Sequence, residues 1–127
     1  MRRPRDWFRQ AELDLAAAAD ARRSGHHEWA CFAAQQAAEK AVKALHEADG
    51  AEAWGHSTAE LLRAIPQVPT DVFNAARALD KHYIPARYPN SHPAGAPGDL
   101  YTEEEADRAL RDAERVIEHV RRRLPPA

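Results

Sequence analysis

Cysteine is almost absent from this chain, since Cys31 is the only one in 127 residues. A single thiol excludes an internal disulfide and is typical of the reducing cytoplasm, which is the compartment we expect. No apolar run approaches the ~20 residues that a membrane-spanning helix needs, and the basic N-terminus lacks the apolar segment of a signal peptide. These absences favour a cytoplasmic protein that does not contact a membrane.

Glycine is also scarce, with five residues, and no glycine-rich phosphate-binding loop occurs. The histidines lack the spacing and the cysteine pairs of a zinc site, and the acidic residues lack the spacing of a calcium loop. We therefore expect no metal and no cofactor. The net charge of −2 gives no global field that attracts nucleic acid. Arginines do cluster near both ends, where solubilising charge is the default interpretation and a phosphate-binding patch the alternative.

Apolar residues recur at helical spacing throughout the chain, and no strand pattern occurs. We expect helices over residues 4–24, 27–49, 58–65, 70–83 and from 103 onward, with capping boxes at Ser57 and Thr102. The second of these helices is rich in alanine, and its apolar stripe includes Trp29; small side chains let a partner helix approach closely. The sequence thus predicts one all-α domain over residues 1–127, an antiparallel up-and-down bundle of four to five helices.

One long proline-rich loop interrupts this pattern between Ile84 and Tyr101. Proline removes a backbone donor and clashes with the preceding helical turn, so the chain must leave its helix here and run extended. Loops of this length in small domains are usually functional or disordered, and the density of proline favours a stiff one. We therefore expect an ordered loop that holds Tyr83, Arg87 and Tyr88 in fixed positions.

Two stretches carry a family resemblance. The first runs from Trp29 to Leu45 (WACFAAQQAAEKAVKAL), and the second from Leu79 to Pro89 (LDKHYIPARYP), followed by Tyr101 and Thr102. Together, in this order and spacing, they resemble the HEPN domain, the "higher eukaryotes and prokaryotes nucleotide-binding" domain. The resemblance covers nearly the whole chain, from the first helix to the last.

This resemblance implies a fold, an activity and partners. HEPN proteins are helical bundles that often dimerise with a groove between the protomers, and many are metal-independent ribonucleases. Small prokaryotic members are often encoded beside a nucleotidyltransferase, with which they form a toxin–antitoxin pair. We accordingly expect a homodimer, a nucleotidyltransferase partner protein, and RNA or a nucleotide as ligand. The alternative is a non-catalytic helical module that binds a nucleotide or a protein.

Arg87 and His92 are the candidate catalytic residues, because the family's ribonucleases carry an Arg followed four to six residues later by a His. An Arg can hold a scissile phosphate with two hydrogen bonds, and a His can move a proton at a ribose hydroxyl. Arg22/His27 and Arg77/His82 share the spacing, but only Arg87/His92 lies wholly in the loop. The alternative is a structural role, in which Arg87 ties the loop to the bundle.

Lys40, Lys43, Tyr83 and Tyr88 are the candidate residues for binding RNA or a nucleotide. The two lysines share one face of the second helix, where Glu39 can pair with Lys43 one turn away. A solvated face is the default interpretation of this pattern. The alternative is a groove in which Lys40 meets a phosphate.

Overall fold

The computed structural model describes residues 2–126, and the regular structure in that range is entirely helical, which confirms the all-α class. The elements are α1 (Pro4–Arg23), α2 (His27–Ala48), α3 (Thr58–Leu62), α4 (Thr70–Asp80), the 3-10 turn η1 (Pro89–Ser91), α5 (Pro97–Leu100) and α6 (Glu103–Arg123). Between residues 2 and 126, no helix is both long enough and apolar enough to cross a membrane.

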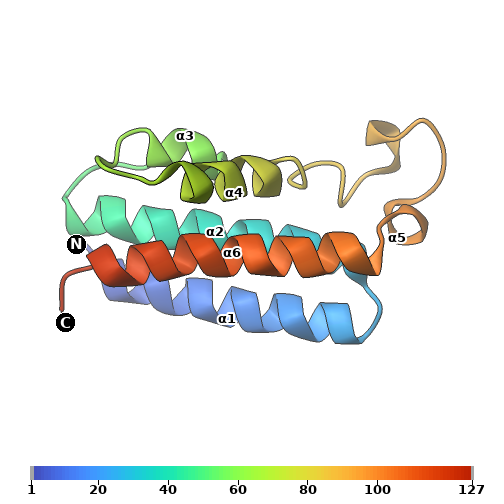
Figure 1. Cartoon of the computed structure of the whole chain (residues 1–127), viewed down its shortest axis with the longest axis horizontal. Coiled ribbons are helices and arrows are strands. Elements are labelled where there is room, and N and C mark those ends of the chain that lie inside the picture. The colour runs from blue at the N-terminus through green and yellow to red at the C-terminus, as the bar shows by residue number, and fades with distance from the viewer. Residues whose placement is uncertain (1, 127) are drawn as a thin grey trace.

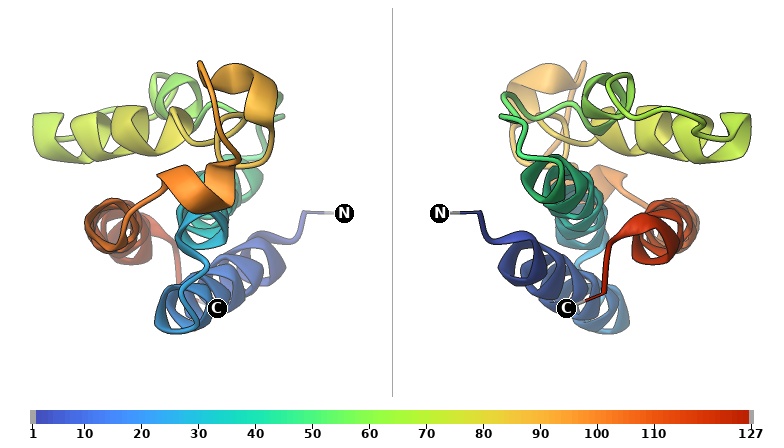
Figure 2. Two further views of the ribbon diagram at one scale, coloured as in Figure 1. Left: turned by 90° about the vertical axis from the view of Figure 1, so that its right-hand side faces the viewer. Right: turned by 90° about the vertical axis from the view of Figure 1, so that its left-hand side faces the viewer.

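Three long helices form the body of the molecule. Figure 1 shows α1, α2 and α6 lying side by side, with α2 and α6 running in the same direction and α1 running opposite to both. The short α3 and the longer α4 form a second layer over α2 and α6. Seen along the bundle in Figure 2, α4 lies across the other helices at a steep slant. The loop segment between α4 and α6, including α5, lies at one end of the bundle, opposite the end where α1 begins and α6 ends (Figure 1).

The buried face of α2 consists mainly of alanine. Six of its alanines are fully buried at 0% exposure: Ala30, Ala34, Ala37, Ala38, Ala41 and Ala44. Because a methyl group adds little width, α1 and α6 can both pack closely against this helix. The prediction that Trp29 belongs to the buried stripe is wrong, since its side chain lies on the outside of the first turn with 49% of its surface exposed.

The two predicted capping boxes have different outcomes. At α6 the box is complete: Thr102 Oγ1 accepts from the Glu105 backbone N–H at 3.2 Å, and the Glu105 carboxylate accepts from the Thr102 N–H at 3.0 Å. At α3 only half of it forms. Ser57 Oγ accepts from the Glu60 N–H at 3.1 Å, but the Glu60 carboxylate pairs with Arg63 at 3.0 Å.

Asp80, the last residue of α4, caps α3 in a different way. Its carboxylate accepts from the backbone N–H groups of Thr58 and Ala59 at 2.8 and 3.0 Å. It also accepts from the Ser57 hydroxyl at 2.9 Å and from the buried Gln35 amide of α2 at 3.3 Å. A carboxylate at a helix N-terminus is favourable for the helix dipole as well as for the unpaired N–H groups. Asp80 therefore fastens α3, α4 and α2 together.

The loop is more regular than the sequence predicts. The fourth helix ends at Asp80 rather than near Tyr83, and residues 81–87 form successive turns instead of an extended strand. Pro89 and Pro97 occupy the first turns of η1 and α5, where a missing N–H costs nothing. Proline thus excludes a helix interior without excluding short helical turns that begin at each proline.

The close packing around α2 leads to a stability prediction. Ala37→Leu inserts three carbon atoms where the side chain is fully buried, so the unfolding free energy should fall by about 1–3 kcal/mol. Ala17→Leu on the exposed face of α1 is the matched control and should change it by no more than about 0.5 kcal/mol. Urea denaturation measures both. Equal effects at the two sites would contradict tight packing around α2.

Candidate functional site

Arg87 lies at the centre of an aromatic cluster. Its guanidinium carbon is 4.5 Å from the ring centroid of Phe32, 4.7 Å from that of Tyr83 and 5.2 Å from that of Tyr88. Its Nε donates to the Tyr83 carbonyl at 2.9 Å. Among residues 2–126, no carboxylate pairs with this guanidinium, and no group accepts from its terminal nitrogens. The side chain is therefore fixed by cation–π contacts, with two nitrogens left to bind an external anion.

His92 lies farther along the same loop and is held separately. Its Nε2 is 2.7 Å from the Pro85 carbonyl oxygen. A carbonyl only accepts, so Nε2 carries the proton and Nδ1 keeps a lone pair. The ring also lies edge-on to Tyr101, at a centroid distance of 6.2 Å. The structure thus places Arg87 and His92 in one loop, but with no contact partner in common.

Lys40 and Lys43 both lie in ion pairs. Lys40 Nζ bonds the Asp14 carboxylate of α1, and Lys43 Nζ lies 3.1 Å from Glu39 Oε2, as predicted for residues one turn apart. The default interpretation of a solvated face is wrong, because Glu39 is only 3% exposed. Because a carboxylate neutralises each ammonium group, these lysines attract a phosphate less strongly than Arg87 does.

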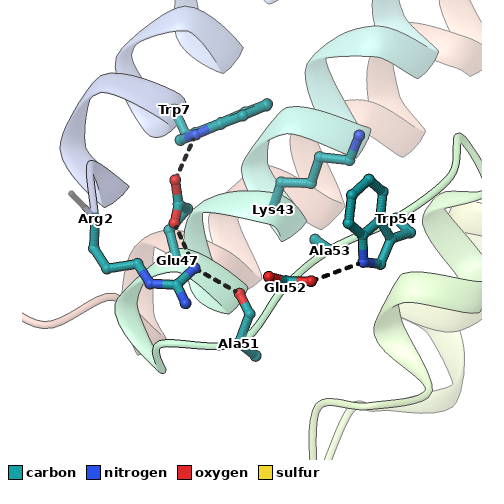
Figure 3. A pocket seen from close by; sticks show the side chains of 8 residues that line it. All are labelled: Arg2, Trp7, Lys43, Glu47, Ala51, Glu52, Ala53 and Trp54. Atoms are coloured by element: carbon teal, nitrogen blue, oxygen red, sulfur yellow. Dashed lines mark hydrogen bonds and ion pairs between the residues drawn. The ribbon is translucent and has the colours of Figure 1, made fainter.

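Lys43 also lines a cavity of about 250 Å³ between α1, α2 and the chain that follows α2 (Figure 3). The indoles of Trp7 and Trp54 stand on either side of it, and Trp54 is 81% exposed. Trp7 Nε1 donates to Glu47 at 3.0 Å, and Arg2 pairs with the same carboxylate at 3.2 Å. The polar groups that line this cavity are thus already partnered within the chain.

A third histidine, His56, joins the aromatic cluster although nothing in its sequence position marks it. Its ring stacks on Tyr83 at a centroid distance of 4.8 Å and an angle of 16°. Its Nδ1 lies 3.3 Å from Glu39 Oε1, and its backbone carbonyl accepts from Gln35 Nε2 at 2.9 Å. The sequence feature that could have indicated this contact lies on α2, where Gln35 and Glu39 are one turn apart among buried alanines. Buried polar groups at that spacing require partners from elsewhere in the chain.

The remaining candidates lie in structural roles. His82 Nδ1 lies 3.0 Å from the Tyr101 hydroxyl, and burial lowers the pKa of His82 while it raises that of Tyr101. Arg77 stacks on Phe73 instead, at 4.8 Å. Cys31 is fully buried, and burial raises the pKa of its thiol to about 12, so it is no nucleophile at neutral pH. In the described range, no three His, Cys, Asp or Glu side chains group as metal ligands.

The aromatic cluster gives Arg87 a measurable structural role. Arg87→Ala removes three cation–π contacts and one hydrogen bond, and should lower the unfolding free energy by about 1–3 kcal/mol. The matched control is Arg115→Ala, which breaks an exposed ion pair with Asp71 and should cost at most about 1 kcal/mol. Chemical denaturation compares the two. An Arg87→Ala protein as stable as the control would show that the rings do not hold the loop.

Comparison with known proteins gives consistent results. The family model described as the HEPN domain matches residues 4–123. The chain is 26% identical, over 127 aligned residues, to a protein of Methanocaldococcus jannaschii named "Putative toxin MJ1304". That match covers 91% of this chain and 84% of the relative.

Solved structures agree with this result. The crystal structure of TT1696 from Thermus thermophilus has a TM-score of 0.94 and 49% identity, covering 98% of this chain and 100% of that one. The structure of ST0689, described as an archaeal HEPN homologue, has a TM-score of 0.86 and 42% identity, covering 98% of this chain and 100% of that one. The structure of the HEPN domain protein tm0613 of Thermotoga maritima has a TM-score of 0.76 and 34% identity, covering 94% of this chain and 97% of that one.

Proposed function

The chain belongs to the HEPN family, and on that premise we propose that it is the RNA-binding toxin component of a two-protein toxin–antitoxin pair. The similarity to a protein named as a toxin supports the biological role. The antitoxin partner in this proposal is a separately encoded nucleotidyltransferase. Its gene should adjoin the gene for this chain, as is common for small prokaryotic HEPN proteins.

The guanidinium of Arg87 is the observation that carries the RNA-binding part of the proposal. A planar guanidinium that is already stacked loses little freedom when it binds a phosphate with two hydrogen bonds. An exposed aromatic ring lies close by, since Tyr88 contacts the guanidinium and is 48% exposed. Aromatic rings that stack bases, beside a cation that holds the backbone, are the usual elements of a site for single-stranded RNA.

Cleavage of the bound RNA without a metal is the finer part of the proposal. In it, Arg87 holds the scissile phosphate and stabilises the charge that develops in the transition state. A histidine moves the proton of a ribose hydroxyl. His92 is the candidate that the sequence predicts for that role, and in the structure its Nε2 is occupied by the Pro85 carbonyl while its Nδ1 keeps a lone pair. A non-catalytic nucleotide-binding or protein-binding module is the alternative, which would use the same surface without the proton transfer.

RNA binding and cleavage can be tested together. The purified protein should bind a single-stranded RNA with an affinity that falls as salt rises, and should cleave it in the presence of EDTA. Arg87→Lys should weaken binding about tenfold, because a point charge does not replace the bidentate fork. Arg115→Lys is the matched control. If the wild type binds the RNA without cleaving it, the non-catalytic binding module is the correct function. If the wild type does not bind RNA, the proposed function is rejected.

A homodimer is the remaining proposal. The alanine face of α2 cannot form it, because α1 and α6 already cover that face. Exposed apolar side chains instead occur at the loop end of the bundle, on the first turn of α2, on the loop and on α5: Trp29, Ile84 and Leu100. Two copies that meet there would bring their Arg87 clusters toward one groove.

Light scattering tests the dimer directly. At tens of micromolar the wild-type protein should have twice the mass of one chain, and Trp29→Asp should reduce that mass to one chain. Leu13→Asp, at an equally exposed apolar position on α1, is the control and should stay dimeric. A wild-type protein with the mass of one chain at this concentration would exclude the homodimer.

A further inference from the structure

We propose that His56, oriented by Glu39, is the catalytic base of this surface and accepts the proton of a ribose 2′-hydroxyl next to a phosphodiester held by Arg87. The inference rests on the proposed function, since it needs RNA at the Arg87 cluster. It assigns the proton transfer to a residue outside the loop that carries the family-type Arg and His.

Two side chains of α2, Glu39 and Gln35, hold His56 in place. Glu39 is 3% exposed, and its two oxygens are divided between Lys43 Nζ at 3.1 Å and His56 Nδ1 at 3.3 Å. Gln35, which is fully buried, donates to the His56 backbone carbonyl at 2.9 Å. A carboxylate that accepts from Nδ1–H selects the tautomer with the lone pair on Nε2. The same arrangement of a buried carboxylate and a histidine orients the general base in hydrolases.

The other side of His56 is open to solvent. Its side chain is 59% exposed, and no residue between 2 and 126 bonds to Nε2. The imidazole is therefore held at its backbone and at Nδ1 while Nε2 can reach a ligand. A histidine that merely satisfied the buried Glu39 would have no need of this exposure.

Tyr83 connects His56 to Arg87. The His56 ring centroid is 4.8 Å from that of Tyr83, and the Arg87 guanidinium carbon is 4.7 Å from the same centroid. A proton acceptor and an anion-binding fork thus contact one aromatic ring. His92 has no such link, because its side chain contacts Pro85 and Tyr101 instead.

The reaction that this arrangement supports is transesterification within the RNA. His56 Nε2 takes the proton of the 2′-hydroxyl, and the 2′-oxygen forms a bond to the adjacent phosphorus. The bond from phosphorus to the 5′-oxygen breaks, and that oxygen takes a proton from water. The hydroxide that remains takes the proton back from His56, which restores the base. The products are a 2′,3′-cyclic phosphate and a 5′-hydroxyl, and no metal, oxidant or second substrate takes part.

His56→Phe is the variant that separates catalysis from packing. Phenylalanine keeps a ring that can stack on Tyr83 but has no nitrogen to accept a proton. Cleavage of a single-stranded RNA by the full-length protein should fall by about 100-fold or more, the usual contribution of a general base. The dissociation constant for the same RNA should stay within about threefold, which is less than one tenfold step of 1.4 kcal/mol. His26→Phe, at the exposed histidine before α2, is the matched control and should keep cleavage within the same factor.

Glu39→Gln tests the positioning role. It keeps the shape of the side chain but removes the charge that selects the His56 tautomer, so kcat should fall while KM changes little. Glu47→Gln, which removes the charge of another partly buried carboxylate of α2, is the matched control and should keep kcat. A thermal unfolding midpoint close to that of the wild type in each variant shows that folding is not the cause. Equal losses of kcat in Glu39→Gln and Glu47→Gln would overturn the positioning role.

The outcomes distinguish this inference from the function on which it rests. Cleavage that persists in His56→Phe and disappears in His92→Ala overturns the inference and leaves a ribonuclease whose base is His92. A wild-type protein that binds RNA but never cleaves it overturns the catalytic role of His56 and leaves the binding function. A wild-type protein that neither binds nor cleaves RNA overturns both.

Discussion

Two of the three buried polar side chains of α2, Gln35 and Glu39, determine how the segment before α3 and the end of α4 sit on this helix. Gln35 and Glu39 are buried by the same packing that buries the alanines around them, so each must find hydrogen-bond partners from other segments. Gln35 takes the carbonyl of His56 and the carboxylate of Asp80, while Glu39 takes His56 and Lys43. The chain before α3 and the end of α4 are thereby held over the middle of α2.

The environment of Arg87 follows from this arrangement. The turns after α4 bring Tyr83 and Tyr88 to the guanidinium, and α2 brings Phe32. Rings stabilise the cation without cancelling its charge, whereas a carboxylate would neutralise it. The same contacts that brace the loop therefore leave Arg87 attractive to an anion, so that structural and binding roles coincide in one side chain.

The sequence predicts the long helices well, because apolar periodicity and caps are local properties. Thr102 and Glu105 lie three residues apart and form the box that their spacing predicts. Ser57 and Glu60 share the pattern but not the outcome, since Glu60 pairs with Arg63 and Asp80 from another helix accepts from the next two N–H groups. Local patterns fail where a tertiary contact competes with them, and α5, a single turn, has too little periodicity to be detected.

The candidate site could be predicted only in part for the same reason. Arg87, Tyr83 and Tyr88 stand in one short stretch that prolines and aromatics make conspicuous. His56 is 17 positions from the carboxylate that orients it and 27 from the ring on which it stacks, and no spacing rule joins such residues. The position of Trp29 was predicted wrongly because helical periodicity defines faces but not which neighbour covers the first turn.

The alanine-rich interior also bears on how stability varies with temperature. Of the 29 buried apolar residues in the described part of the chain, 15 are alanine. An alanine exposes little apolar surface when the chain unfolds, and newly hydrated apolar surface is what raises the heat capacity of the unfolded state. The heat-capacity change on unfolding should therefore be smaller than is usual for a chain of this length. A smaller change flattens the curve of unfolding free energy against temperature, so close packing of small side chains extends the range over which the fold persists.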